Sequence, residues 1–221
     1  LVRRFQSSRL DDVDEFGDDV YFGLQRMGVL AKVEHGILAG ASVTLSDDEL
    51  KEVQTLRRLP ASVTESLGRD VPRTEALLDS IKDLPSDWPV LVFATSVGHA
   101  QVMAGLLRTE GVSAATITGK TDPAARRYYI EEFRRGRIRV LTNYAVLTAG
   151  FDAPQVRAVY VARPTYSPAL YQQMIGRGLR GPLNGGKEVC LIVNVADNIV
   201  NYDRQLAFTQ FEYLWRLGLE E

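Results

Sequence analysis

The amino-acid sequence predicts an α/β fold in which helices flank a parallel β-sheet. The run Val90–Ala94 is apolar throughout, which is typical of a parallel strand buried on both faces. Apolar segments recur at 114–118, 138–141, 156–161 and 189–195, and helix-like segments separate most of them. Alternation of this kind favours a parallel sheet covered by helices. With 221 residues and 45% hydrophobic content, the chain can bury one full domain and part of another.

Residues 1–71 are expected to form an N-terminal extension ahead of the compact part. The patterns in it predict an acidic loop at 11–19, a short helix at Tyr21–Met27, a strand at Lys32–Leu38 and a polar helix at Ser46–Leu59. The sequence starts at Leu1 without an initiating methionine, which suggests a fragment excised from a longer protein.

Residues 72–221 are expected to be the compact domain, with helices near 73–84, 96–109 and 122–135. Asp122 is a suitable N-cap for the third of these helices. A terminal helix is predicted from Asp197 to residue 217. Its apolar residues repeat at helical spacing and are expected to pack against the sheet: Ala207, Phe211, Leu214 and Trp215.

Composition excludes several classes of protein. No apolar run approaches 18 residues and the first residues do not form a signal sequence, so we expect a soluble, cytoplasmic protein with no membrane partner. Cys190 is the only cysteine, which excludes internal disulfides and a cysteine-rich zinc site, and its apolar surroundings predict an inert core residue. His35 and His99 lack neighbours at metal-ligand spacing, so no metal site is predicted. The net charge of −2 is uninformative, but residues 120–139 hold seven Lys/Arg against three Asp/Glu.

A helix is predicted to begin at Ser167, a good N-cap followed by Pro168, and to end at Gly181-Pro182. At 3.6 residues per turn, one arc of this helix holds Gln173, Gly176, Arg177 and Arg180. The opposite arc is apolar: Leu170, Tyr171, Met174, Ile175 and Leu179. One face can therefore be buried while the other presents two guanidinium groups, which match phosphate oxygens bidentately.

Two glycine motifs in the sequence are misleading. Residues 119–121 read Gly-Lys-Thr like the end of a P-loop, but the full pattern needs glycine at the position of Ala114. Gly176, Gly178 and Gly181 spell G-x-G-x-x-G at the end of a predicted helix, whereas the dinucleotide fingerprint opens one. No Asp-Glu pair follows an apolar strand, so the carboxylates that hold magnesium are absent. We therefore expect this chain alone to be inactive in ATP hydrolysis.

Four segments, in order, resemble the motifs of the second RecA-like domain of superfamily 2 (DEAD/DEAH-type) helicases and translocases. Residues 90–96 resemble motif IV, and 117–121 with Arg126 and Arg127 resemble the motif between IV and V. Residues 140–154 resemble motif V, and Q-x-x-G-R-x-x-R at 173–180 resembles motif VI. The resemblance covers roughly residues 72–200. It implies a RecA-like fold that lacks its own P-loop and serves as the C-terminal motor half of an ATP-dependent helicase or translocase.

The resemblance also implies roles for the motif residues. ATP with Mg²⁺ would be held mainly by a first RecA-like domain of the same protein, missing from this sequence, with residues 1–71 as the connection. The catalytic residues would be Arg177, Arg180 and Gln173, the two arginines reaching the γ-phosphate as arginine fingers. The nucleotide-binding residues would be Gly150, Asp152 and Gly176. Asp152 would accept from a ribose hydroxyl or couple to Arg177; the alternative is a turn residue before Pro154.

Nucleic acid is the second expected partner. In an open α/β sheet, ligands meet the loops at the carboxyl ends of the strands, where hydroxyl and N–H groups can hold phosphates without reading bases. The candidate nucleic-acid-binding residues follow predicted strands: Thr95, Ser96, Gly119, Lys120, Thr142 and Thr148. The wording Leu-Thr-x-Gly-Phe-Asp at 147–152 looks like that of DNA repair and restriction-associated translocases, so DNA is favoured over RNA.

Two other interpretations of the sequence stay open. A non-catalytic nucleic-acid-binding or scaffold domain could have a decayed motor fold, although such a protein has no use for the intact set of Gln173, Arg177 and Arg180. An unrelated nucleotide-dependent enzyme is disfavoured by the missing P-loop.

Overall fold

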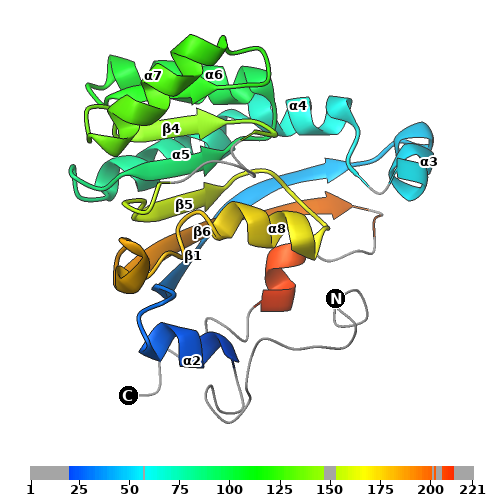
Figure 1. Ribbon diagram of the computed structural model, residues 1–221. Coiled ribbons are helices and arrows are strands. Elements are labelled where there is room, and N and C mark those ends of the chain that lie inside the picture. The colour runs from blue at the N-terminus through cyan, green and yellow to red at the C-terminus, as the bar shows by residue number, and fades with distance from the viewer. Residues whose placement is uncertain (1–19, 57, 147–152, 201, 203–205, 212–221) are drawn as a thin grey trace.

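The computed structural model describes residues 20–56, 58–146, 153–200, 202 and 206–211. In these residues, six strands form one sheet in the order β1-β6-β5-β2-β4-β3, and every pair of neighbours is parallel (Figure 1). The predicted α/β fold with a parallel sheet is confirmed. The strands are Lys32–Thr44 (β1), Val90–Phe93 (β2), Ala114–Ile117 (β3), Val140–Asn143 (β4), Ala158–Val161 (β5) and Val189–Val200 (β6).

The short central strands form where the sequence offers consecutive apolar residues. Every residue of β2, β4 and β5 is buried, as expected for parallel strands with helices on both sides. Leu91 and Phe93 join one hydrophobic cluster, whereas Val90 and Val92 join the other. This alternation is the period of two of a strand. The sheet therefore separates two hydrophobic cores.

Helices cover both faces of the sheet. On one face lie α5 (Val71–Asp83) and α6 (Val97–Thr109), and on the other lie α7 (Pro123–Arg134) and α8 (Pro168–Ile175). In Figure 1, α8 crosses the front of the sheet beside the 3₁₀ helix η3 (Ala207–Phe211). Asp122 caps α7 as predicted, because its carboxylate accepts from the N–H groups of Ala124 (2.8 Å) and Ala125 (3.2 Å).

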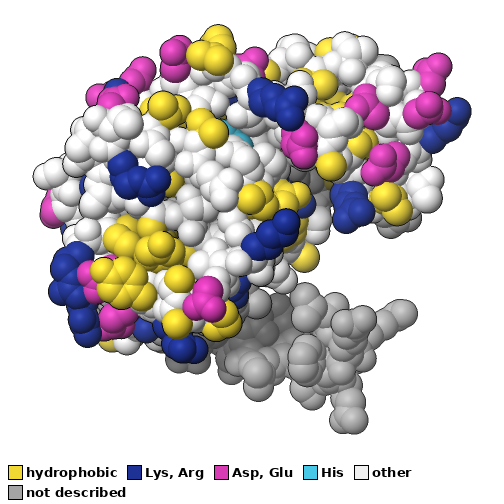
Figure 2. Space-filling view, turned by 90° about the horizontal axis from the view of Figure 1, so that it is seen from above, with side chains coloured by type: hydrophobic (Ala, Val, Ile, Leu, Met, Phe, Trp, Pro, Cys, Tyr) yellow, Lys and Arg dark blue, Asp and Glu magenta, His cyan; other side chains and the backbone are white. Residues whose placement is uncertain are grey.

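The surface over these helices carries charges of both signs. Seen from above, Lys and Arg side chains are interspersed with Asp and Glu side chains, and neither sign covers a continuous area (Figure 2). Within the described residues, no helix combines the length and the apolar content needed to cross a membrane.

Elements of the expected N-terminal extension belong to the same sheet. The helix α2 (Val20–Arg26) leads to β1, which pairs with β6 and runs past the predicted end at Leu38 to Thr44. The polar helix predicted at Ser46–Leu59 is present as α3 (Asp47–Leu56), and a second helix that the sequence pattern did not predict, α4 (Ala61–Arg69), follows it. Pro60 separates them, since proline restricts the residue before it and lacks an N–H for a continuing helix. The domain boundary near residue 72 stays a prediction.

The last strand is longer than predicted. β6 extends through Val200, so the terminal helix expected to start at Asp197 is wrong at that end. The final residues pair with β1 as far as Val200, and their burial alternates as in a strand with one solvated face. Helical structure returns at η3, where Ala207 and Phe211 are buried as predicted. Leu214 and Trp215 lie outside the described residues.

A buried ion pair joins α5 to β6. Arg73 Nε lies 2.7 Å from Asp197 Oδ1 and Arg73 Nη2 lies 2.8 Å from Asp197 Oδ2, with both side chains almost completely buried. The N–H of Ala41 on β1 also donates to Asp197 Oδ1 (3.0 Å), and Arg73 Nη2 donates to the carbonyl of Ala162. A Cβ at Gly40 would lie 2.5 Å from Asp197 Oδ1, so β1 needs glycine there. Breaking such a pair costs about 3–5 kcal/mol, which makes it a strong link between the N-terminal elements and the sheet.

Candidate nucleotide and nucleic-acid site

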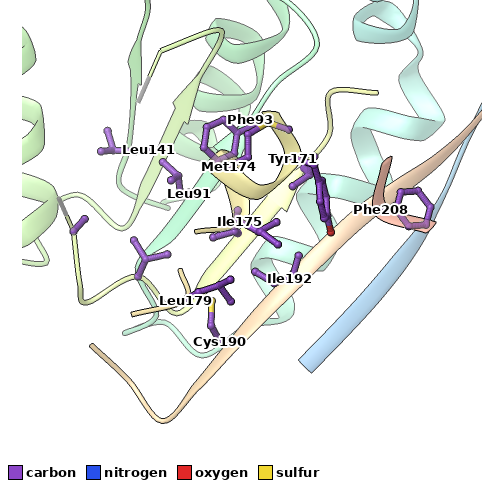
Figure 3. Packing of buried hydrophobic residues seen from close by; sticks show 14 of the residues in the cluster. Leu91, Phe93, Leu141, Tyr171, Met174, Ile175, Leu179, Cys190, Ile192 and Phe208 are labelled. Atoms are coloured by element: carbon purple, nitrogen blue, oxygen red, sulfur yellow. The ribbon is translucent and has the colours of Figure 1, made fainter. Parts of the chain in front are cut away.

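The helix α8 has the two faces that the sequence predicts. It begins at the expected place, where the Ser167 hydroxyl accepts from the N–H of Leu170 (3.3 Å). Figure 3 shows the buried face, with side chains of α8 lying against those of the sheet strands. Gln173 and Gly176 lie on the exposed face. The buried set comprises Tyr171, Met174 and Ile175 from α8, packed with Leu91, Phe93, Cys190 and Ile192 from the sheet.

The end of α8 differs from the prediction. The helix stops at Ile175 with Gly176 as its C-cap, so the expected continuation to Gly181-Pro182 is wrong. The following segment instead runs antiparallel to residues 29–31, with N–H···O distances of 3.0 Å from Ala31 to Leu179 and from Gly181 to Val29. These hydrogen bonds are long-range in sequence. They hold residues 179–181 in an extended conformation.

The two arginines therefore come from different local structures. Arg177 directly follows the C-cap and is half-buried, whereas Arg180 lies in the extended segment, in an antiparallel bridge with Leu30. The expected single helical arc for both is wrong. Between them, Gly178 is pressed against the sheet: a Cβ there would lie 2.4 Å from Cys190 Sγ. The close approach at Gly178 fixes where the backbone between the two guanidinium groups can run.

A cavity of about 470 Å³ borders this segment, and Arg180 is the one charged residue among its described lining. A guanidinium in the lining of a cavity can bind an anionic group such as a phosphate. Gln172, which the sequence analysis does not single out, lines this cavity, and Gln173 does not. Its spacing of four residues from Gly176 is the signal that could have identified it. The lining residues are Tyr21, Val29, Leu30, Gln172, Ile175, Gly176, Leu179, Arg180, Asn184 and Phe211.

At the carboxyl end of β2, the candidate hydroxyls make internal hydrogen bonds. Ser96 is half-buried and caps α6, with its Oγ accepting from the N–H of His99 (3.1 Å). Thr95 is fully buried, and its Oγ1 lies 3.0 Å from Nδ1 of His99. Thr142 is fully buried within β4 and donates to the carbonyl of Ala100 (2.8 Å). These contacts show Thr95 and Thr142 supporting the strand ends from inside.

The loop after β3 presents the other described candidates at the surface. Gly119 and Lys120 are exposed, and a Cβ at Gly119 would meet no atom within 4 Å. The loop is held by its neighbours: the N–H of Thr118 donates to Thr121 Oγ1 (2.9 Å), and Arg126 Nη2 donates to the carbonyl of Thr118 (2.9 Å). The N–H groups of Lys120 (3.2 Å, to Thr118 Oγ1) and Thr121 (3.2 Å, to the Thr118 carbonyl) are also used inside the loop, so the exposed Lys120 side chain is the group it can present to a phosphate.

Three predicted site residues belong to the segment that follows β4. Thr148, Gly150 and Asp152 lie in residues 147–152, outside the described part of the chain. On the two sides of this segment, Ala145 has φ = +53°, in the left-handed region, and Ala153 is buried.

Burial alters the chemistry of two candidate reactive groups. Burial raises the pKa of the Cys190 thiol to about 12, which makes it the inert core residue that the sequence predicts. Burial, followed by the positive charge of Arg73, lowers the pKa of His99 to about 4, so its imidazole is neutral near pH 7. Among the described residues, no three His, Cys, Asp or Glu side chains gather in a way that could hold a metal ion.

Comparisons with known proteins agree with this fold. Residues 73–181 match the family described as helicase conserved C-terminal domain. The chain is 35% identical over 163 residues to the "Putative mitochondrial ATP-dependent helicase irc3" of Schizosaccharomyces pombe, covering 74% of this chain and 24% of that protein. It is 30% identical over 104 residues to the ATP-dependent RNA helicase DBP10 of Chaetomium globosum, covering 47% of this chain and 14% of that protein.

Solved structures give the same fold. The C-terminal domain of the DEAD-box protein Dbp5 aligns with a TM-score of 0.50 at 21% identity, over 67% of this chain and 79% of that chain. The present chain spans about a quarter or less of the length of the two curated relatives. Taken together, the parallel sheet, the ordered motifs and the family match show that this chain contains, over residues 73–181, the helicase conserved C-terminal domain of superfamily 2, a RecA-like domain.

Proposed function

We propose that the chain is the C-terminal motor half of an ATP-dependent nucleic-acid helicase or translocase. Its partner in catalysis is a first RecA-like domain of the same protein, which holds ATP with Mg²⁺. The observation that carries the proposal is the position of the two arginines. One face of α8 is locked into the core, and the backbone that follows it places Arg177 and Arg180 outside that core.

Bound ATP supplies the phosphoryl group that passes to water. In this chain, Arg177 and Arg180 neutralise the negative charge that develops on the γ-phosphate, for which arginine fingers contribute on the order of 10³–10⁵ in rate. Gln173 lies exposed on the same helix and offers an amide to the reacting groups. Gly176 leaves the backbone at the end of α8 uncovered, so a nucleotide can approach it closely. Gly150 and Asp152, outside the described residues, complete the proposed nucleotide contacts.

The nucleic-acid strand runs along the carboxyl ends of the strands. The amino end of α6, capped by Ser96, and the loop of Gly119 and Lys120 hold backbone phosphates, with Thr148 as a further contact. Thr95 and Thr142 are left out of direct contact because both are fully buried. Backbone contacts of this kind do not read sequence. DNA is the first substrate to test, because the sequence motif at residues 147–152 resembles that of DNA translocases. RNA is the comparator.

The test is Arg177→Lys in the full-length protein. Lysine keeps the charge and loses the planar fork, so a contact made mainly in the transition state should reduce kcat by about tenfold or more while nucleotide affinity changes little. Arg180→Lys should behave alike. Arg135→Lys is the control: this exposed residue, the C-cap of α7, pairs with Glu131 at 2.8 Å, and such surface pairs contribute about 0–1 kcal/mol.

Turnover, nucleotide affinity and thermal stability are measured on the same samples. If Arg177→Lys lowers the melting temperature and leaves turnover per folded molecule unchanged, Arg177 is structural and leaves the mechanism. If the full-length protein binds nucleic acid but never hydrolyses ATP, the scaffold interpretation replaces the motor.

A further inference from the structure

A second cavity, of about 480 Å³, lies at the carboxyl end of β2 and shares no lining residue with the Arg180 cavity. Residues of α4 and of the start of α6 line it, together with Tyr144, which directly follows β4. Its size is within the range of small-ligand sites. The lining residues are Ala61, Thr64, Glu65, Gly68, Arg69, Ser96, Val97, Gly98, His99, Val102 and Tyr144.

Tyr144 is supported from the side of β5. The guanidinium carbon of Arg163 lies 5.0 Å from the centroid of the Tyr144 ring, within the range of a cation–π contact. Arg163 borders a separate, smaller cavity, and Tyr144 is not part of that cavity. Arg163 therefore supports the ring on one side, while the ring itself borders the larger cavity. Both side chains are half-buried, which limits their movement.

The backbone after Tyr144 is strained. Ala145 has φ = +53°, and it is the one residue other than glycine with a positive φ in the described part of the chain. A side chain in the left-handed region carries a steric cost, and such residues cluster where function constrains the backbone. The strained residue directly follows Tyr144, so the chain turns immediately after the ring that borders the cavity.

Polar groups near the start of α6 also belong to the lining. The N–H of Thr95 donates to Nδ1 of His99 (3.3 Å), so the neutral imidazole carries its proton on Nε2. That Nε2 atom is buried and has no hydrogen-bond partner within the residues described. In α6, a helix of 13 residues, Ser96 Oγ accepts from the N–H of His99, and the N–H groups before it lack intrahelical acceptors and favour an anion. Glu65 is the one acid in the lining, and it pairs with Arg69 at 3.4 Å.

We propose that one nucleotide of the bound strand occupies this cavity, with its base stacked on Tyr144 and its phosphate at the amino end of α6. The inference rests on the proposed function, because it assumes that a strand crosses this edge of the sheet. It adds a base contact to a surface otherwise expected to hold only the backbone. A π-face is common to all bases, so the contact tolerates any sequence.

The test compares Tyr144→Leu and Tyr144→Phe with wild type in the full-length protein. The probes are single strands of one length. One strand carries every base, and each of the others has a single abasic site at a different position. Stacking on an aromatic residue is worth about 5- to 150-fold in affinity per base, so one abasic position should weaken binding to the wild type by this order. Tyr144→Phe should keep that difference, and Tyr144→Leu should remove it. A 2-aminopurine at the same position should be quenched by wild type and Tyr144→Phe only.

The outcomes separate this inference from the proposed function. If wild type binds based and abasic strands equally at every position, the stacking site is wrong and the strand-binding motor stands. If wild type binds neither strand, the proposed function itself fails. Should Tyr144→Leu fail to fold, Arg163→Gln decides. This variant keeps the Tyr144 ring and removes its cation–π contact with Arg163. It should reduce the preference for the intact strand over the abasic strand by about two- to fivefold. An unchanged preference in that variant would count against base stacking on Tyr144.

Discussion

At the scale of single residues, His99 shows how burial makes a polar side chain sensitive to pH. The side chain is 2% exposed and lies near the charge of Arg73, which itself pairs with Asp197. Burial, and then Arg73, lower the pKa of His99 from 6.5 to about 4. The folded protein therefore keeps the imidazole neutral at pH values where an unfolded chain would protonate it.

We predict that the free energy of unfolding falls as the pH drops from 6.5 towards 4. The unfolded state binds the proton that the folded state excludes, so the contribution is fully present above pH 6.5 and is lost below it. Each unit of pKa corresponds to about 1.4 kcal/mol, which limits the loss to about 3 kcal/mol. His99→Asn, whose Oδ1 can replace Nδ1 as the acceptor for Thr95, should give a flatter profile. Urea unfolding of both proteins at about pH 4.5, 5.5 and 6.5 measures the difference.

Carboxylates whose pKa values also differ between the folded and unfolded states are shared by the two proteins. Glu49 and Glu132 have pKa values lowered by hydrogen bonds from Ser62 and from Arg137, respectively, and they are present in both proteins. Their contribution cancels in the difference between wild type and His99→Asn. Parallel pH profiles for the two proteins would contradict the assignment to His99.

Residue positions near strand ends were only partly predictable. The sequence places Thr142 near the end of a strand, but it does not show that β4 is paired on both sides as far as Asn143. A residue that is paired within a central strand points towards the helices that cover the sheet. The Thr142 hydroxyl therefore donates to the carbonyl of Ala100 on α6. Only residues beyond the last pair, such as Tyr144, border the open edge of the sheet.

At the scale of elements, the segment after α8 depends on one glycine. A Cβ at Gly178 would lie 2.4 Å from Cys190 Sγ and 2.8 Å from Val159 Cγ2, both closer than real Cβ contacts allow. The two neighbours come from adjacent strands, β6 and β5, so neither can move without disturbing the sheet.

Gly178→Ala should therefore destabilise the protein by about 1–3 kcal/mol, the usual cost of overpacking a core. Adding Cys190→Ala removes the sulfur and should restore part of the loss. The matched control is Gly105→Ala in α6, where a Cβ would meet nothing within 4 Å. That change should be neutral or stabilise by up to about 1 kcal/mol, because alanine favours a helix. Thermal or urea unfolding of the variants decides, and an equal effect of the two glycine changes would refute the packing argument.

Two of the element boundaries missed by sequence reasoning, the end of α8 and the end of β6, share one cause. β2 and β3 could be predicted because their apolar runs are local signals. The end of α8 and the extension of β6 are set by pairing with residues 29–31 and with β1, which are distant in the chain. Helical periodicity in residues 176–181 was real, but tertiary hydrogen bonds outweighed it.

At the scale of the whole molecule, the parallel sheet fixes the geometry of both proposed ligand surfaces. All the strands end at the same edge, so the loops after β2, β3 and β4 lie together where the proposed function puts the nucleic-acid strand. Arg177 and Arg180 come instead from the segment that follows α8. The near-neutral net charge and the mixed charges of Figure 2 give no broad basic field. Strand affinity should therefore depend on a few phosphate contacts at the loops.

This arrangement predicts weak and salt-sensitive binding by the 221-residue chain alone. Each phosphate neutralised on a single strand adds about 0.7 to the slope of log affinity against log salt. Lys120 is exposed on the loop after β3, so Lys120→Ala should weaken binding at low salt and reduce that slope by about this amount. Lys51→Ala on α3 is the control, since Lys51 is exposed and pairs with Asp48 at 3.4 Å. Titrations at several salt concentrations with two base sequences measure both quantities. A slope unchanged by Lys120→Ala would remove this loop from the strand-binding surface, and strong dependence on base sequence would show that the chain reads more than the backbone.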